Sequence, residues 1–252
     1  KLIIIAVSLL SFILLLGIIL VMEFFDNTLK NVSVAEEKLK IPGMGMLSKL
    51  FITNDKLDLN SIQERLMELC MQNLNHALKT QDSSNKTKVI TIISAQRDEG
   101  KTVIASNIAR KLKHAGKSVL VFNHSNISKP EIRSKQLPLL HRFLGYQDPR
   151  KDYSHPFLAD TSDYLNESEY LTYELNAGFY NAKSYEGLTL EVAKISNQQP
   201  DYVIIELPNI LETNYPADLI GTSDMVLLVC RSNRLWSKAD ENLLNNIKEI
   251  TH

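Results

Sequence analysis

The most apolar part of the chain is its first segment, from Leu2 to Met22. None of these residues is charged, and only Ser8 and Ser11 carry polar side chains. At the rise of an α-helix this length spans about 30 Å, the thickness of the hydrocarbon core of a bilayer. The pattern therefore predicts a transmembrane helix. A signal peptide would have a shorter apolar region followed by small residues, and a buried helix of a soluble protein would be shorter.

A charged segment with helical spacing follows, from Glu23 to Lys40, and it ends where Pro42 and two nearby glycines interrupt the pattern. After a polar linker, the residues from Ser61 to Leu78 again show apolar side chains at helical spacing. Ser61 and Glu64 occupy the positions of a capping box, which predicts the start of this helix. We expect a transmembrane helix, a membrane-proximal segment with a linker, and a third, larger domain, at residues 1–23, 24–56 and 57–252.

Short runs of consecutive apolar residues predict the strands of the last part. They lie at residues 88–94, 118–122, 201–207 and 224–230. Strands that are buried on both faces have such runs, and this is typical of a parallel sheet covered by helices. Helical patterns occur at residues 101–115, 184–198 and 236–250. The fold class is therefore α/β, a parallel sheet with helices on both faces, preceded by one transmembrane helix. The glycine-lysine-threonine loop that follows the first of these strands, at residues 95–102, makes the predicted sheet P-loop NTPase-like.

One loop in this domain has a pattern associated with phosphate binding. Residues 95–102 read AQRDEGKT, and a predicted strand precedes them while a predicted helix follows. Backbone N–H groups of such a loop and the N-terminus of the next helix bind phosphates. Lys101 is expected to contact the terminal phosphates and Thr102 to join the Mg²⁺ shell. We expect ATP and Mg²⁺ as ligands, held by Ala95, Asp98, Glu99, Gly100, Lys101, Thr102 and Val103.

This loop also departs from the usual P-loop. Ala95 stands where the first glycine normally lies, and no other glycine precedes Gly100, so the loop conformation depends on residues 96–99. Asp98 and Glu99 place negative charge near the predicted phosphate site. The motif therefore predicts the fold of a P-loop and leaves ATP binding as a separate question.

Charge and cysteine content exclude some classes of protein. The formal net charge is −1 at pH 7, so there is no electrostatic basis for binding nucleic acid. Cys70 and Cys230 lie far apart and do not have the spacing of a metal site. Two cysteines in a chain of this length do not predict a disulfide scaffold, which favours a reducing compartment.

Several segments together resemble one family, the bacterial polysaccharide co-polymerases whose cytoplasmic domain is a tyrosine kinase. The segment after the second membrane span of these proteins has an acidic start, an Asp-x-Thr-like step, and Pro-x-x-Gly before the cytoplasmic domain. Here the matching residues are Glu23, Asp26, Thr28, Pro42 and Gly45.

The resemblance continues to the end of the chain. "MQNL" at 71–74 is similar to the helix before the P-loop of that family. "DYVIIELPNI" and "DMVLLVCRSNR" resemble the second metal-motif strand and the strand after it. The resemblance implies the C-terminal half of a chain-length regulator of exopolysaccharide, capsule or lipopolysaccharide O-antigen, with a periplasmic domain and a first span upstream of Lys1.

The same resemblance implies a location and partners. The expected location is the bacterial inner membrane, with the P-loop domain in the cytoplasm. The expected partners are membrane lipid, further copies of the chain, and a polysaccharide polymerase or export machinery. A separate active kinase or phosphatase is a further candidate partner, and no nucleic acid is expected.

The catalytic motifs of the family are incomplete in this chain. Asn123 and Ser125 stand where two aspartates are expected, and neither side chain can accept a proton as a base. Glu206 replaces the aspartate of the third motif and can still reach Mg²⁺ through a water molecule, so Thr102 and Glu206 are the predicted metal ligands. Glu206 and His124 are weak candidates for a catalytic base.

Two further family elements are absent. Arg65, Glu68 and Met71 align with an E-x-x-R-x-x-R element that builds rings of subunits, and the chain ends without a tyrosine-rich tail. These departures favour a co-polymerase whose tyrosine-kinase-like domain is catalytically impaired and has a structural or regulatory role. An active tyrosine autokinase, with Glu206 and His124 compensating, is the alternative.

Other P-loop and nucleotide-binding classes fit less well. A partition- or septum-type ATPase usually carries an extra lysine early in the loop and lacks a leading transmembrane helix. A dinucleotide oxidoreductase would need a G-x-G-x-x-G after a strand, and this chain has none.

Overall fold

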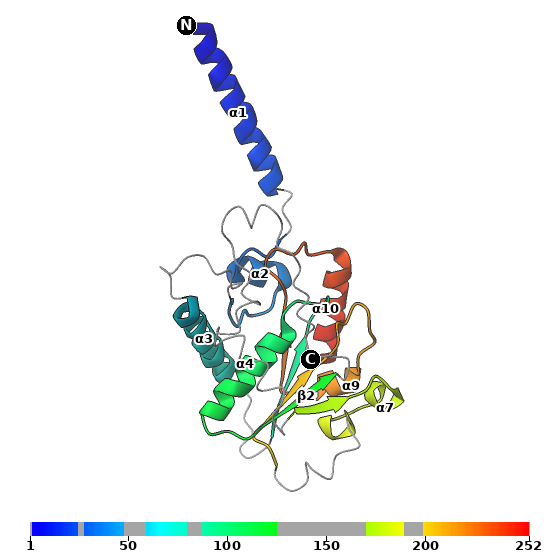
Figure 1. Cartoon of the computed structure of the whole chain (residues 1–252). Coiled ribbons are helices and arrows are strands. Elements are labelled where there is room, and N and C mark those ends of the chain that lie inside the picture. Colours follow the sequence, from blue (N-terminus) through cyan, green and yellow to red (C-terminus); the bar gives the residue numbers. More distant parts are fainter. Residues whose placement is uncertain are drawn as a thin grey trace, which may run out of the picture.

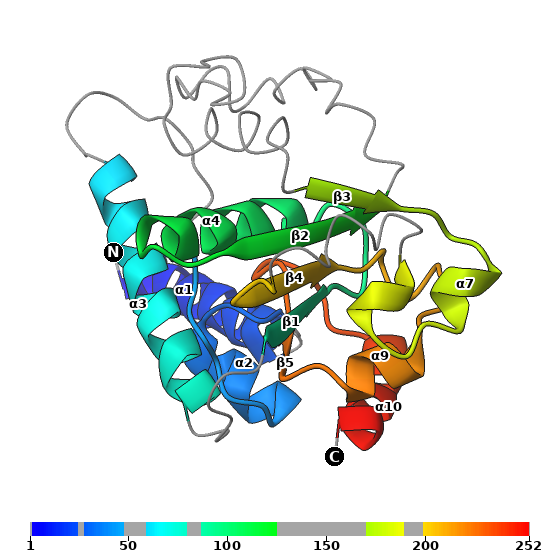
Figure 2. The same cartoon turned by 90° about the horizontal axis from the view of Figure 1, so that it is seen from below.

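The core of the protein is one parallel β-sheet. The structure is a computed structural model and describes residues 2–24, 28–47, 59–79, 87–124, 170–188 and 199–251. Five strands pair in the order β3-β2-β4-β1-β5, and every pair is parallel (Figure 2). Their bounds are β1 Lys88–Ile93, β2 Val119–His124, β3 Tyr170–Tyr173, β4 Tyr202–Glu206 and β5 Met225–Leu228. The predicted α/β class and parallel sheet are confirmed.

Side chains of the central strands alternate between two apolar clusters. In β1, Ile90 and Ile92 belong to one cluster and Ile93 to the other. In β4, Ile204 belongs to the first cluster and Ile205 to the second. Because both clusters are buried, most positions of these strands are apolar, which explains the continuous hydrophobic runs in the sequence.

Two helices cover the first face of the sheet, α3 (Leu59–Lys79) and α4 (Lys101–His114). They lie side by side on the same side of the strands in Figure 2. One stripe of α3 is buried against α4 and the sheet, and it consists of Met67, Met71, Leu74 and Leu78. The predicted helix at 61–78 is thus present, but it begins at Leu59, so Ser61 is not its N-cap. Glu64 instead lies in the second turn of α3 and pairs with Arg110 and Lys111 of α4.

Short elements and one long helix cover the opposite face (Figure 2). They are α7 (Ala177–Tyr180), the 3₁₀ turn η2 (Tyr185–Leu188), α9 (Ala217–Gly221) and α10 (Lys238–Thr251). The helix predicted at 184–198 is not an α-helix where it is described, because residues 185–188 form η2, and residues 189–198 lie outside the described residues. Helices on both faces are confirmed.

Strand β3 was not expected from the sequence. It is a four-residue edge strand that pairs with β2, so that Leu171 lies opposite Phe122. Its sequence, YLTY, alternates polar and apolar residues and lacks the continuous apolar run of the other strands. An edge strand of this length carries too little pattern to be recognised.

Helix α1 (Leu2–Phe24) extends away from the rest of the molecule in Figure 1. It is long and apolar enough to cross a membrane, and the span with this property is Ile3–Val21. None of that span is buried against other parts of the described chain.

The helical pattern predicted from Glu23 to Lys40 covers two different structures. Helix α1 ends at Phe24, and Thr28 forms an isolated antiparallel bridge with Leu235. Helix α2 (Val32–Leu39) begins only after Asn31, whose side-chain oxygen accepts the N–H of Val34. An asparagine side chain can accept a hydrogen bond from a free N–H group in the first turn of a helix. Asn31 therefore favours the start of a separate helix at this position over the continuation of one long helix.

Residues 28–47, which we call the α2 segment, pack onto the sheet domain. Leu29 and Leu39 are buried in a small cluster with Leu244 of α10, and Trp236 packs against it. The Lys248 ammonium donates to the carbonyl oxygen of Leu39 at 2.6 Å. On the other side, the amide of Asn73 in α3 donates to the carbonyl oxygen of Met44. The α2 segment is therefore held against both α10 and α3.

Candidate functional site

The predicted phosphate loop connects β1 to α4 at the carboxyl end of the sheet. The loop start is fixed by two backbone hydrogen bonds, from Ile210 N–H to Ser94 O and from Leu211 N–H to Ala95 O. Gly100 precedes α4 with φ = 95°, a conformation that side chains rarely adopt, so glycine is required there. Asp98 also has a positive φ, 58°, which aspartate tolerates better than most residues.

Lys101 and Thr102 are the first two residues of α4, as expected for a P-loop. The Lys101 ammonium donates to the Ser94 hydroxyl oxygen at 2.6 Å. The Thr102 hydroxyl donates to Oε1 of Glu206 at 2.7 Å. Val103 follows in the same turn, and its carbonyl oxygen accepts from the Asn107 amide. The structure thus brings Lys101, Thr102 and Glu206 together, at the adjoining ends of β1 and β4.

Glu206 is the last residue of β4 and is buried. Its second carboxylate oxygen, Oε2, is enclosed and has no hydrogen-bond partner among the described residues. Burial raises the pKa of Glu206, and the Thr102 hydrogen bond and the Lys101 charge only partly oppose this effect. A buried carboxylate oxygen without a partner is costly, and a cation beside it would remove that cost.

Lys101 also lies in a partly buried position. Burial lowers the pKa of its ammonium group, while the charges of Glu206, Glu99 and Asp98 act in the opposite direction. A partly desolvated cation at a helix N-terminus attracts anions more strongly than one in bulk water. This is the electrostatic arrangement that phosphate groups require.

Glu99 does not face the phosphate side of the loop, contrary to the expectation that both acids add charge there. Its side chain is 1% exposed and pairs with the guanidinium of Arg234, with 2.8 Å between Oε1 and the nearer nitrogen. Its other oxygen accepts the backbone N–H of Gln96 at 3.0 Å. Asp98 is exposed, so it alone places an unburied carboxylate at this loop.

Arg234 is a site residue that the sequence did not reveal. It also pairs with Asp240 in the first turn of α10, and the Asp240 carboxylate accepts from the hydroxyl and the N–H of Ser237. Burial alone would raise the pKa of Asp240, but the hydrogen bonds of Ser237 and Arg234 hold it below its ordinary value. Arg234 and Glu99 lie 135 positions apart, and no sequence motif connects them.

An amide, Asn123, stands where the resemblance predicts a carboxylate. Asn123 is 4% exposed near the end of β2, and its side-chain oxygen accepts the N–H of His124. Ser125, the other replaced position, lies outside the described residues. Strand β2 pairs with β4, and Phe122 is the partner of Ile205 in that pairing. Asn123 is the next residue of β2, so it lies beside the end of β4.

His124 lies at the end of β2, next to the edge strand. Its ring meets the ring of Tyr173 edge-on, with 5.8 Å between centroids. Burial lowers the pKa of His124, which keeps the imidazole neutral at physiological pH. The Tyr173 hydroxyl donates to the carbonyl oxygen of Glu206 at 2.6 Å, so His124 and Glu206 are connected through one aromatic residue.

The oxygen atoms at the end of β4 and the start of α4 suit Mg²⁺. Within the described residues, no group of three or more His, Cys, Asp and Glu side chains could hold a metal by itself. Mg²⁺ commonly takes one or two protein oxygens and completes its shell with waters and nucleotide phosphates. Thr102 and Glu206 fit that role, because one offers a hydroxyl and the other a buried carboxylate oxygen without a partner.

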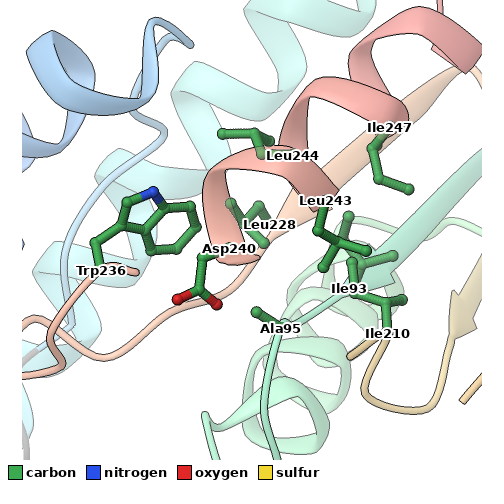
Figure 3. A pocket seen from close by; sticks show the side chains of 9 residues that line it. All are labelled: Ile93, Ala95, Ile210, Leu228, Trp236, Asp240, Leu243, Leu244 and Ile247. Atoms are coloured by element: carbon green, nitrogen blue, oxygen red, sulfur yellow. The ribbon is translucent and has the colours of Figure 1, made fainter. Parts of the chain in front are cut away.

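A small cavity lies on the core side of the loop rather than on its phosphate side. Figure 3 shows Ala95 pointing into it from the loop, with Trp236 and Asp240 at the start of α10 and apolar side chains around them. Its lining is almost entirely apolar, and the space inside is small. It cannot hold a nucleotide, so the candidate site is the open face of the loop.

Comparisons with known proteins support the fold. No family model matches the sequence, and no curated protein matches it. The structure is similar to the kinase domain of Escherichia coli tyrosine kinase ETK, with a TM-score of 0.54 and 14% identity over 88% of this chain and 90% of that chain.

Two other solved structures have a TM-score of 0.49. They are the BceF tyrosine kinase domain, at 16% identity over 88% of this chain and 94% of that chain, and the chimerical protein CapA2B2, at 18% over 88% and 92%. The likeness to the ETK domain shows that the chain has the fold of a bacterial tyrosine kinase domain. At this identity the likeness concerns the fold.

Proposed function

We propose that the chain is a membrane-anchored polysaccharide co-polymerase, a chain-length regulator of bacterial surface polysaccharide synthesis or export. Its P-loop domain lies in the cytoplasm, binds ATP with Mg²⁺, and is impaired in phosphoryl transfer. Support comes from the tyrosine-kinase-like fold, from the apolar helix α1, and from the segments that resemble this family on either side of the P-loop. Helix α1 would anchor the chain in the inner membrane.

The observation that carries nucleotide binding is the cluster of Lys101, Thr102 and Glu206. The lysine supplies a partly buried positive charge for the terminal phosphates, and the loop supplies backbone N–H groups. Thr102 and Glu206 would hold Mg²⁺, which would neutralise phosphate charge when it is bound. Glu99 does not oppose this arrangement, because Arg234 pairs with its carboxylate.

The proposed impairment rests on Asn123. Transfer of a phosphoryl group to a tyrosine needs a well-placed metal and a group that accepts the hydroxyl proton. An amide oxygen binds a metal more weakly than a carboxylate and is not a base at physiological pH. The oxygen of Asn123 is also already engaged by the N–H of His124. The domain would therefore bind ATP but would be impaired in transferring its terminal phosphoryl group.

The proposed partners follow from the same assignment. Membrane lipid would surround α1, and further copies of the chain and the polymerase or export machinery would form the functional assembly. A separate active kinase or phosphatase would supply the phosphate control that an impaired domain lacks.

Calorimetric titration of ATP into the full chain, held in lipid nanodiscs, tests nucleotide binding. We expect a dissociation constant in the micromolar range that becomes smaller when Mg²⁺ is added. Lys101→Met should abolish binding. Lys117→Met is the matched control, because this exposed lysine lies just beyond the opposite end of α4. Absence of binding at millimolar ATP in the wild-type chain would refute the nucleotide-binding role.

The second candidate is an active tyrosine autokinase. Glu206, with a raised pKa, and His124, which stays neutral, are two groups that could accept a proton. This candidate predicts phosphotyrosine after incubation with ATP and Mg²⁺, and its loss in Lys101→Met. Mass spectrometry of the incubated chain decides between the two: robust Lys101-dependent phosphorylation would exclude the impaired domain.

A further inference from the structure

Leu235 is an apolar side chain on the surface of the loop between β5 and α10, residues 229–237. It is 64% exposed, although its backbone forms the bridge with Thr28. A hydrogen bond from the N–H of Arg234 to the carbonyl oxygen of Arg231, at 3.3 Å, closes a turn immediately before it. A single exposed leucine is ordinary on a protein surface, so its place relative to α1 decides what it contacts.

The bridge places Leu235 close to the end of α1. Phe24 is the last residue of α1 and precedes Thr28 by four positions. A chain of this length covers at most about 14 Å, and the two residues of an antiparallel bridge lie about 5 Å apart. The backbone of Leu235 therefore lies within about 20 Å of the end of α1.

The end of α1 lies in the headgroup layer when α1 spans a bilayer. The apolar span ends at Val21, and Phe24 lies about 4.5 Å farther along the helix. The headgroup layer on each side of the hydrocarbon core is about 5–7 Å thick. Phe24 thus reaches the headgroups, and the β5–α10 loop lies within reach of the same layer.

The end of the domain that carries the bridge is held beside the bilayer. Leu29 directly follows the bridge and is buried in the cluster with Leu244 of α10. The connection between α1 and the domain is therefore no longer than the residues between Phe24 and Thr28. Figure 1 shows the start of α10, which follows the β5–α10 loop, at the end of the domain nearest to α1.

The side chains around Leu235 suit a lipid surface. The β5–α10 loop contains no acidic residue. Arg231 within it and Lys238 just after it are exposed, and anionic lipids attract such charges near the membrane surface. Trp236 is half-buried beside Leu235, and tryptophan is enriched at the level of the headgroups.

We propose that the β5–α10 loop is a membrane-contact site, at which Leu235 inserts between lipid headgroups while Arg231 and Lys238 bind the phosphates of anionic lipids. The proposal rests on the proposed anchoring of the chain by α1 and adds a second contact to it. A helix alone holds the domain near the bilayer without setting its tilt. A second contact beside that helix sets the tilt of the cytoplasmic domain.

The test uses the natural tryptophan, because the chain has only one, Trp236. The full chain is reconstituted into vesicles of phosphatidylcholine and anionic phosphatidylglycerol whose acyl chains carry bromine, which quenches nearby tryptophan. Leu235→Trp in a Trp236→Phe background places the reporter at the tip of the loop. Tyr180→Trp in the same background is the matched control, because Tyr180 is also exposed and α7 lies away from α1 in Figure 1. Phe12→Trp in that background reports on α1 itself.

We expect the brominated lipids to lower the emission of Leu235→Trp by about twofold and to leave that of Tyr180→Trp unchanged. In the chain that keeps Trp236, Leu235→Ser should reduce the quenching of this tryptophan. The double change Arg231→Gln and Lys238→Gln should lower it to the value in vesicles of phosphatidylcholine alone, because the attraction to anionic lipid is lost. Thermal unfolding checks that each variant is folded.

The reporter in α1 separates the loop contact from the anchor. Quenching of Phe12→Trp without quenching of Leu235→Trp would overturn the loop contact and leave the anchor standing. Equal quenching of Leu235→Trp and Tyr180→Trp would also overturn it, because the proximity would not be specific to the loop. If neither Leu235→Trp nor Phe12→Trp is quenched, both the anchor and the loop contact fail. Quenching of Leu235→Trp alone would support the loop contact and refute the anchor.

Discussion

Thr102, in the first turn of α4, donates its hydroxyl hydrogen to Oε1 of Glu206, the last residue of β4, at 2.7 Å. The two residues lie 104 positions apart in the sequence. The P-loop hydroxyl and the strand-end carboxylate are the two groups expected to hold Mg²⁺. Their mutual hydrogen bond occupies the hydroxyl, so it has to be exchanged when a metal binds.

Replacing Glu206 should separate metal binding from stability. In Glu206→Gln we expect the gain in ATP affinity caused by Mg²⁺ to fall by at least about tenfold, because a neutral amide is a weaker ligand. Since the pKa of Glu206 is raised in the folded state, its charge costs stability above that pKa and costs nothing below the unfolded value. The variant without nucleotide should therefore be as stable as wild type, or more stable, at neutral pH. Urea unfolding that shows a clear loss of stability would contradict this.

The affinity for Mg²⁺ and ATP should fall at both low and high pH, which gives its pH profile an acid limb and an alkaline limb. The acid limb belongs to Glu206, whose pKa lies above its ordinary value of 4.5 because the side chain is buried. The alkaline limb belongs to Lys101, whose pKa lies below its ordinary value of 10.5 for the same reason. Affinity should fall as Glu206 is protonated and again as Lys101 is deprotonated. In a calorimetric pH series, Glu206→Gln should lose the acid limb and Lys101→Arg should extend binding to higher pH.

Restoring a carboxylate at position 123 should make stability depend on Mg²⁺. Asn123→Asp places a second acid near the end of β4, at a position that is 4% exposed. Without metal we expect a loss of on the order of 2 kcal/mol in the free energy of unfolding, from burying an unpaired charge near Glu206. Mg²⁺ with ADP should recover most of that loss. Equal melting temperatures with Mg²⁺ and with EDTA would argue against a metal site at this edge.

An ion pair between α3 and α4 should contribute measurably to stability. Glu64 pairs with Arg110 at 2.6 Å, and the arginine side chain is only 12% exposed. Glu64→Ala should cost about 1–2 kcal/mol, because it leaves that guanidinium without its carboxylate. Glu68→Ala is the control, since its exposed pair with Arg65 should contribute less than about 0.5 kcal/mol.

The same pair predicts a pH dependence. Burial alone would raise the pKa of Glu64, but hydrogen bonds from Lys111 and Arg110 hold it below its ordinary value. Its contribution is therefore present above the unfolded pKa and is lost as the pH falls through the folded value. Denaturation of both variants as the pH is lowered should show the Glu64→Ala deficit shrinking. A deficit that grows in acid would contradict the ion pair.

The apolar stripe of α3 offers a matched pair of leucines. Leu74 is 0% exposed and belongs to the cluster between α3 and the sheet, while Leu69 is 43% exposed. Leu74→Ala should lower the free energy of unfolding by about 3 kcal/mol through lost burial and a cavity. Leu69→Ala should change it by less than about 1 kcal/mol. Similar denaturant midpoints for the two variants would mean that α3 does not pack as described.

Local patterns in the sequence were sufficient for the sheet and the P-loop. The strands β1, β2, β4 and β5 have continuous apolar runs because both of their faces are covered. The loop was recognisable because Gly100, Lys101 and Thr102 must follow each other directly to bind phosphate. Such features depend on neighbouring residues, and a single sequence displays them.

Features that depend on distant residues were not predictable. The pairing of Glu99 with Arg234 joins two loops, and either residue alone reads as an ordinary surface charge. The bridge between Thr28 and Leu235 likewise interrupts a helical pattern, and the partner residue lies more than two hundred positions away in the sequence. In the candidate site, the sequence identified the residues expected near the phosphates. It did not identify Arg234, which pairs with Glu99 of the loop.

The strand order has a consequence for how the protein folds during synthesis. The central strand β1 pairs with β4 and β5, and the N–H of Val89 bonds to Asp224, which lies 135 positions later. At about 5–20 residues per second, the ribosome needs on the order of 10 s to supply those partners. During that interval the apolar strands β1 and β2 are present without their neighbours. The two strands therefore stay unpaired on these edges until β4 and β5 have been made.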